Sequence, residues 1–134
     1  MKTSAETEKR EKAAALKFFE LIGQGRMKEA RSLFAPKCKQ HNPYLPEGVD
    51  ALLDGITKVQ GDQQAMPSDM RFRIRHVMVD GNMVAIYTTF ESKSSPSKGF
   101  RQVHLFRFIG NKIVEYWDIT QHVPKNSQHA QRMF

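Results

Sequence analysis

A single carboxylate, Asp118, stands in the middle of the apolar, strand-forming run Ile113–Gln121, with Trp117 and Ile119 as its immediate neighbours. Charged side chains are rarely buried without a partner, so an acid in such a run needs a reason. If its face of the strand is covered, desolvation disfavours the ionised form and suits the carboxylate to proton transfer near neutral pH. The alternative is structural: an Asp at a strand end that pairs with one of the many Lys or Arg side chains.

A second strand is predicted at Phe100–Ile109, and Gly110-Asn111-Lys112 joins it to the first in a sequence suited to a hairpin loop. If Ile109 to Asn111 form a three-residue loop with Asn111 left-handed, Phe108 faces Lys112 and the even-numbered residues share one face. That face carries Gln102, His104, Phe106, Phe108, Val114, Tyr116, Asp118 and Thr120.

The loop type therefore decides whether His104 and Asp118 can work together. A two-residue loop would put them on opposite faces of the sheet. For His104 the structural alternative is a core histidine whose ring is satisfied by a neighbouring hydroxyl or carboxylate.

Length and composition indicate one compact domain over residues 1–134, ending in a polar tail at 123–134. The charged N-terminus lacks the apolar core of a signal peptide, and no run approaches the ~18 residues of a membrane span. The single cysteine, Cys38, excludes an internal disulfide and a cysteine-based zinc cluster. A cytoplasmic protein with no membrane partner is expected.

The formal charge of +7 raises the question of nucleic acid, but the basic residues are scattered. Arg71, Arg73 and Arg75 alternate with apolar or aromatic residues, as on the wet face or edge of a strand. No nucleic-acid partner is expected. No metal or cofactor is expected either, because the five histidines lack ligand spacing and the chain has no glycine-rich nucleotide motif. A hydrolase is disfavoured because no Gly-x-Ser-x-Gly elbow is present.

Three helices precede the strands. The first begins at a capping box of Thr3 and Glu6 and ends near Gly23; the second is short, carries Met27 to Phe34 and is terminated by Pro36; the third runs from Gly48 to about Gln64. Two further strands are predicted at Met70–Val79 and Met83–Glu91. This order predicts an α+β fold in which three N-terminal helices pack on a curved, mainly antiparallel sheet. Because the strands are apolar on both sides, a homodimer through the sheet is expected.

Two motifs carry a family resemblance: Gln40-His41-Asn42-Pro43 and Lys112-Ile113-Val114-Glu115-Tyr116-Trp117-Asp118. Together with the order of elements they resemble the SnoaL-like polyketide cyclases of the nuclear transport factor 2-like (NTF2-like) superfamily, over roughly residues 8 to 124. The resemblance implies a cone-shaped α+β barrel with a deep apolar pocket. It also implies an intramolecular aldol condensation without metal or cofactor.

Within that resemblance, Asp118 matches the family's acid/base and His104 its pocket histidine, while Tyr116 stands where many relatives have a histidine. The expected substrate is a hydrophobic small molecule with a carbonyl. Asp118 would remove the adjacent proton and His104 would donate a hydrogen bond to the enolate oxygen. The expected binding residues are His41, Asn42, Tyr44, Tyr87, Gln102, Phe106 and Tyr116. The alternative is a binding module without turnover, because a shared fold does not transmit a reaction.

Overall fold

The structure is a computed structural model in which residues 4–134 are described. Its helices are α1 (Ala5–Gly23), α2 (Met27–Ser32) and α3 (Val49–Gly61), with two short 3₁₀ turns, η1 (Pro96–Lys98) and η2 (Ala130–Met133). Its strands are β1 (Phe34–Gln40), β2 (Arg71–Asp80), β3 (Met83–Glu91), β4 (Phe100–Ile109) and β5 (Lys112–His122).

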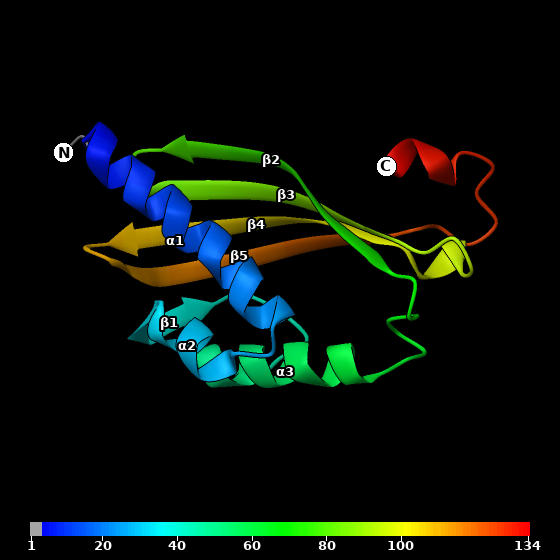
Figure 1. Cartoon of the computed structure of the whole chain (residues 1–134), viewed down its shortest axis with the longest axis horizontal. Helices are drawn as coiled ribbons and strands as arrows, with labels where there is room; N and C mark the ends of the chain where they lie inside the picture. Colours follow the sequence, from blue (N-terminus) through cyan, green and yellow to red (C-terminus); the bar gives the residue numbers. More distant parts are fainter. Residues whose placement is uncertain (1–3) are drawn as a thin grey trace.

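The five strands form one sheet in the order β1-β5-β4-β3-β2. The pairs among β2, β3, β4 and β5 are antiparallel, and β1 lies parallel to β5. The helices lie on one side of this curved sheet (Figure 1). The α+β prediction is therefore confirmed. The strands do not close into the barrel that the resemblance implied, because β1 and β2 are edge strands. The helices complete the enclosure (Figure 1).

The strand β1 was not predicted from the sequence. The second helix ends at Ser32, so Phe34 and Pro36 lie in a strand instead of at the end of a helix. Pro36 is tolerated because β1 is an edge strand, and because its pairing with β5 is irregular between Phe34 and Lys39. The Gln40 end of β1 leads directly into the chain segment that supplies Asn42.

The β4–β5 hairpin differs from its predicted loop but keeps the predicted facing. Ile109 pairs with Lys112, so Gly110 and Asn111 form a two-residue loop, in which Gly110 has the positive φ of 60°. A β-bulge at Val114 then inserts one extra residue between the pairs Phe108–Ile113 and Arg107–Glu115. Ile113 takes the inward place expected of Val114, and the bulge brings His104 directly opposite Asp118.

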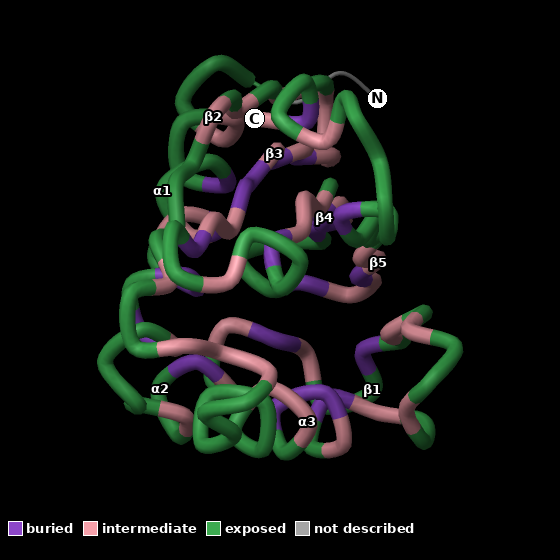
Figure 2. Tube along the Cα trace, turned by 90° about the vertical axis from the view of Figure 1, so that its right-hand side faces the viewer, coloured by how far each residue is buried: buried purple, intermediate pink, exposed green. Residues whose placement is uncertain are grey.

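The core fills the space between the helices and the inward face of the sheet, where buried residues gather (Figure 2). Phe18 of α1 is central, since its ring packs edge-on against Phe34 and Phe106. Ser4 caps α1 by accepting a hydrogen bond from the backbone N–H of Thr7. Of the predicted capping box, Thr3 lies outside the described residues.

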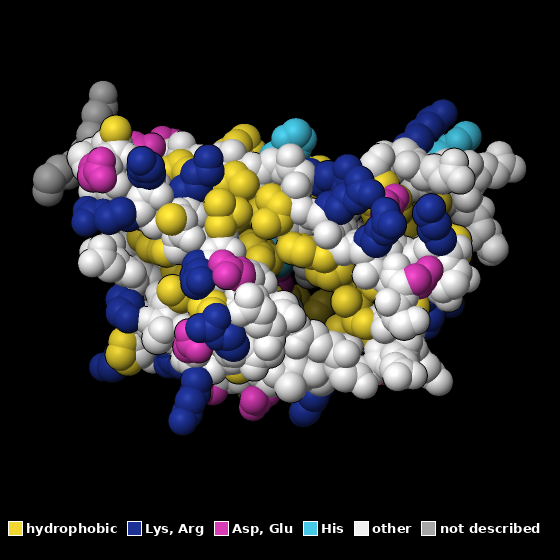
Figure 3. Space-filling view, viewed as in Figure 1, with side chains coloured by type: hydrophobic (Ala, Val, Ile, Leu, Met, Phe, Trp, Pro, Cys, Tyr) yellow, Lys and Arg dark blue, Asp and Glu magenta, His cyan; other side chains and the backbone are white. Residues whose placement is uncertain are grey.

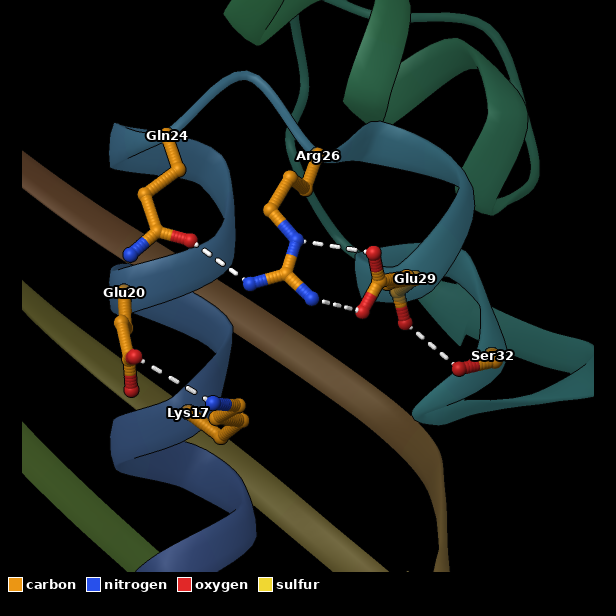
Figure 4. Close-up of polar contacts among 6 residues, drawn as sticks. All are labelled: Lys17, Glu20, Gln24, Arg26, Glu29 and Ser32. Atoms are coloured by element: carbon orange, nitrogen blue, oxygen red, sulfur yellow. Dashed lines mark hydrogen bonds and ion pairs between the residues drawn. The ribbon is translucent and has the colours of Figure 1, made fainter.

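Polar contacts hold the corner between α1 and α2 (Figure 4). The guanidinium of Arg26 donates to the side-chain oxygen of Gln24 and to both carboxylate oxygens of Glu29. Lys17 and Glu20 form an ion pair one turn earlier in α1. These exposed contacts lie at the end of α1, which forms part of the wall of the cavity described below.

The chain after β5 returns to the sheet. Met133 in η2 is buried, and its carbonyl accepts a hydrogen bond from the Tyr87 hydroxyl at 3.2 Å. The Phe134 ring lies beside Gly99, where an added Cβ would meet it at 3.1 Å. The last residues of the polar tail therefore pack against β3 and the turn before β4. In the described part of the chain, no helix has the length and apolar character needed to cross a membrane.

Candidate active site

A cavity of about 470 Å³ lies between α1, α3 and the inward face of the sheet. Figure 3 shows this face of the molecule hollowed between the end of α1, α3 and the start of β2, with hydrophobic side chains around the hollow. The cavity has the size and apolar lining of a small-molecule site. Its aromatic lining residues are Phe18, Phe19, Tyr44, Phe72, Phe90, Phe100 and Tyr116, and its polar ones include Asn42, Gln60, Gln102, His104 and Asp118.

Asp118 lines this cavity as a half-buried carboxylate. Asn42 Nδ2 lies 3.1 Å from one of its oxygens and 3.2 Å from the other. Burial raises the pKa of Asp118, and the hydrogen bond from Asn42 partly opposes that rise because it stabilises the ionised form. A carboxylate in this setting can exchange protons closer to neutral pH than an exposed Asp can.

The amide of Asn42 is oriented by the turn that carries it. The side-chain Oδ1 of Asn42 accepts a hydrogen bond from the backbone N–H of Tyr44 at 2.9 Å, and the backbone N–H of Asn42 donates to Gln40 Oε1 at 2.8 Å. With the amide oxygen engaged in this way, the NH₂ group is the one that faces Asp118. The sequence Gln40 to Tyr44 thus positions one donor on the carboxylate.

His104 lines the cavity but is buried, and both of its ring nitrogens are occupied. Nδ1 lies 2.7 Å from the Tyr116 hydroxyl, and Nε2 lies 3.2 Å from Thr88 Oγ1. Burial lowers the pKa of His104 to about 3, so the imidazole is neutral at physiological pH. The geometry matches the structural alternative, a histidine satisfied by hydroxyls, and does not support direct donation from His104 to a substrate.

Tyr116 lies two residues before Asp118 on the same face of β5, opposite Phe106 and diagonal to His104, and it also lines the cavity. Its ring is fully enclosed, and burial together with the nearby Asp118 charge raises its pKa well above the ordinary value. The hydroxyl therefore stays protonated. It can serve as a hydrogen-bond donor beside the carboxylate, a role that the sequence reasoning assigned to His104.

Four of the seven predicted binding residues line the cavity: Asn42, Tyr44, Gln102 and Tyr116. Tyr44 is 92% exposed, which places it at the outer edge of the lining. The amide of Gln102 donates to Thr120 Oγ1 at 2.9 Å, so its carbonyl oxygen is available to a ligand.

The other three do not line the cavity. His41 stacks on Trp117 with ring centroids 4.7 Å apart and contacts Glu115 Oε2 at 2.8 Å, on the opposite side of β5 from Asp118. Tyr87 also faces that outer side, because side chains alternate along β3 and its neighbours Ile86 and Thr88 are the buried ones. Phe106 belongs to the core beneath α1.

Several cavity residues were not singled out from the sequence. Phe18, Phe19 and Ile22 of α1 and Ile56 of α3 belong to the apolar periodicity that predicted those helices, but periodicity does not separate a core position from a cavity wall. Thr88 carried no signal, and its role is visible only because β3 lies beside β4.

Cys38 is buried and its burial raises the pKa of the thiol to about 11, as expected of a packed side chain and not of a nucleophile. Among residues 4–134, no group of three or more His, Cys, Asp or Glu side chains is placed to hold a metal ion.

A family model described as SnoaL-like domain matches residues 15–116. The chain belongs to the SnoaL-like family. A search of curated proteins found no match. The fold is NTF2-like, as several of the solved structures similar to it are named.

Three similar solved structures illustrate the range of this fold. AclR from Streptomyces galilaeus, described as "a putative hydroxylase", is 18% identical, with 85% of this chain and 90% of that chain covered and a TM-score of 0.64. IdmH from Streptomyces antibioticus, described as "a putative polyketide cyclase", is 20% identical, with 83% and 91% covered and a TM-score of 0.63. A structure described as a "putative ketosteroid isomerase" from Kribbella flavida is 14% identical, with 95% and 89% covered and a TM-score of 0.63. At such identities the likeness shows the fold alone.

Proposed function

We propose that this SnoaL-like protein is a cofactor-independent acid/base enzyme that cyclises or isomerises a hydrophobic carbonyl compound. The observation that carries the proposal is the half-buried carboxylate of Asp118 in a mainly apolar cavity, next to a protonated phenol. Solved structures of the same fold with cyclase and isomerase names support this reaction class.

In the proposed reaction, Asp118 removes a proton from the carbon next to the carbonyl, and the electron pair of that C–H bond moves to the carbonyl oxygen as an enolate. The Tyr116 hydroxyl donates a hydrogen bond to the enolate oxygen. For this, the Nδ1–H of His104 donates to the Tyr116 oxygen, and Thr88 donates to Nε2, which leaves the phenolic proton for the substrate. His104 is then a positioning residue.

The enolate carbon next attacks a second carbonyl, or it is reprotonated at another position. The protonated Asp118 returns its proton to the new alkoxide or to that carbon, so the enzyme ends unchanged. General acid–base help supplies only about 10²–10⁴-fold. The cavity must therefore also hold the substrate close to Asp118 and exclude water.

Deuterium wash-in at the α-carbon of β-keto esters and cyclic enones tests the proposal, with wild type compared with Asp118→Asn. We expect exchange in wild type and its loss in the variant, with the fold checked by circular dichroism. Asp80→Asn, at the end of β2, is the matched control and should exchange like wild type. Equal exchange in wild type and Asp118→Asn would refute the role of Asp118.

A binding module without turnover is the second candidate. It is favoured by the double contact of Asn42 with both Asp118 oxygens, which suits a carboxylate that orients a ligand. It predicts that the same compounds raise the melting temperature of the protein while no deuterium enters them.

We also propose that the protein is a cytoplasmic homodimer joined through the outer face of the sheet. Three outward side chains of that face, Met78, Val103 and Ile119, are 63%, 37% and 60% exposed. Ile119→Lys should shift the molar mass measured by light scattering from dimer to monomer. Ile109→Lys, at the hairpin end and 67% exposed, should leave it unchanged. A monomeric wild type, or a dimer unaffected by Ile119→Lys, would count against this interface.

A further inference from the structure

A second cavity, of about 230 Å³, lies between the N-terminal half of α1 and the end of the β4–β5 hairpin. In Figure 1 both of these parts lie at the same end of the molecule. The helix contributes Thr7, Arg10, Glu11 and Ala14, a spacing that puts all four on one face. The hairpin contributes Phe108 and its two-residue loop. No lining residue is shared with the first cavity.

Glu11 makes this cavity chemically unusual. The residue is only 4% exposed, and its Oε2 has no hydrogen-bond partner in the described part of the chain. It is the only buried side-chain oxygen or nitrogen among residues 4–134 found in that condition. Burying a carboxyl without a partner is costly, so a group that supplies the missing donor would bind favourably.

The surroundings of Glu11 define what that donor can be. Ala14 and Phe108 offer an apolar surface for a short hydrocarbon, while the free carboxylate oxygen favours a positively charged N–H donor. Burial and the neighbouring Glu8 raise the pKa of Glu11, and a bound cation would offset that effect. Arg10 is exposed at the rim, donates to Thr7 Oγ1 at 3.4 Å, and could receive an anionic group of the same ligand.

We propose that this cavity binds a small primary ammonium compound, with the ammonium on Glu11 and the hydrocarbon against Ala14 and Phe108. The proposal stands apart from the acid/base site, because it uses different residues and a different cavity. Two kinds of compound carry a primary ammonium group of this type, simple amines and α-amino acids. The position of Arg10 at the rim allows the two to be distinguished.

Isothermal titration calorimetry with three probes that share a 3-methylbutyl chain tests the proposal: 3-methylbutylamine, leucine and 4-methylpentanoate. We expect the amine or leucine to bind wild type and 4-methylpentanoate not to bind. Glu11→Gln should weaken binding at least about tenfold, as loss of a charge-assisted bond implies. Glu6→Gln, which removes the same charge from an exposed site on α1, should bind like wild type.

If leucine binds more tightly than 3-methylbutylamine and Arg10→Gln reduces its affinity to that of the amine, the ligand is an α-amino acid. If leucine binds no more tightly than the amine, its carboxylate adds nothing and the ligand is a simple amine. Amide chemical shifts in wild type provide a readout independent of the variants, and should move within Thr7 to Ala14 and Phe108 to Asn111. Absence of saturable binding of both nitrogen compounds, or equal binding by Glu11→Gln, would overturn the proposal.

Discussion

The buried His104 should make the stability of the fold depend on pH in a defined way. Its pKa is lowered from 6.5 to about 3 by burial, so between these values the unfolded chain binds a proton that the folded chain does not. Stability therefore falls as the pH falls below 6.5. A difference of roughly 3.5 pH units at about 1.36 kcal/mol per unit gives a total loss of about 5 kcal/mol, of which about 2 kcal/mol falls between pH 6.5 and 4.5.

Substitution of His104 by Gln isolates this contribution. The variant should be less stable than wild type at pH 7 by about 1–3 kcal/mol, because the hydrogen bonds to Tyr116 and Thr88 are weakened or lost. That deficit should shrink by about 2–3 kcal/mol between pH 7 and pH 4.5, since Gln has no proton to gain. Other titrating groups cancel in the comparison.

Urea unfolding followed by far-ultraviolet circular dichroism measures the effect. Fluorescence is less suitable, because Trp117 stacks on His41 and its emission therefore also reports on that local contact. His76→Gln, at an exposed histidine of β2, is the matched control, and its free energy of unfolding should change with pH in parallel with that of wild type. If the free energy of unfolding of His104→Gln also varies with pH as that of wild type does, His104 is not a neutral buried imidazole.

Three further substitutions test the site and the core. Tyr116→Phe should lower the free energy of unfolding by about 1–3 kcal/mol, because Nδ1 of His104 loses its partner, and it should slow α-proton exchange. Unchanged stability and exchange would contradict the contact between Tyr116 and His104. Asp118→Asn should raise the free energy of unfolding at pH 7, because the raised pKa of Asp118 means that the folded state disfavours the charge. This advantage should disappear below about pH 4, where Asp is protonated in the unfolded chain as well. A variant less stable than wild type in urea at pH 7 would contradict this expectation. Phe18→Ala should cost about 3–5 kcal/mol in the same assay, and a cost below about 1 kcal/mol would show that Phe18 is not central to the core.

Hydrophobic periodicity was enough to predict the three helices, the four strands β2 to β5 and the inward face of β4. The facing of His104 and Asp118 came out as expected although the loop did not, because the bulge at Val114 offsets the shorter loop. A bulge leaves no clear mark in a sequence of alternating apolar residues. The strand β1 was missed because its short run, with Pro36 inside it, gains its hydrogen bonds only from the distant β5.

The candidate site was harder to predict than the fold. His41 and Asn42 are adjacent in sequence, yet Asn42 contacts Asp118 while His41 stacks on Trp117 across the sheet. Residue type identified both as able to bind, but only the direction of each side chain separates them. The partners of His104 likewise depend on β3 packing beside β4, which no local pattern specifies.

The role of Asp118 as the working base can be tested by the pH dependence of α-proton exchange in wild type and Asn42→Leu. The rate should rise with pH as Asp118 ionises. Because the hydrogen bonds from Asn42 lower the pKa of Asp118, their removal should move this rise to higher pH. An exchange rate whose pH dependence is the same in both proteins would contradict the account, and so would the absence of exchange from compounds that bind in the cavity.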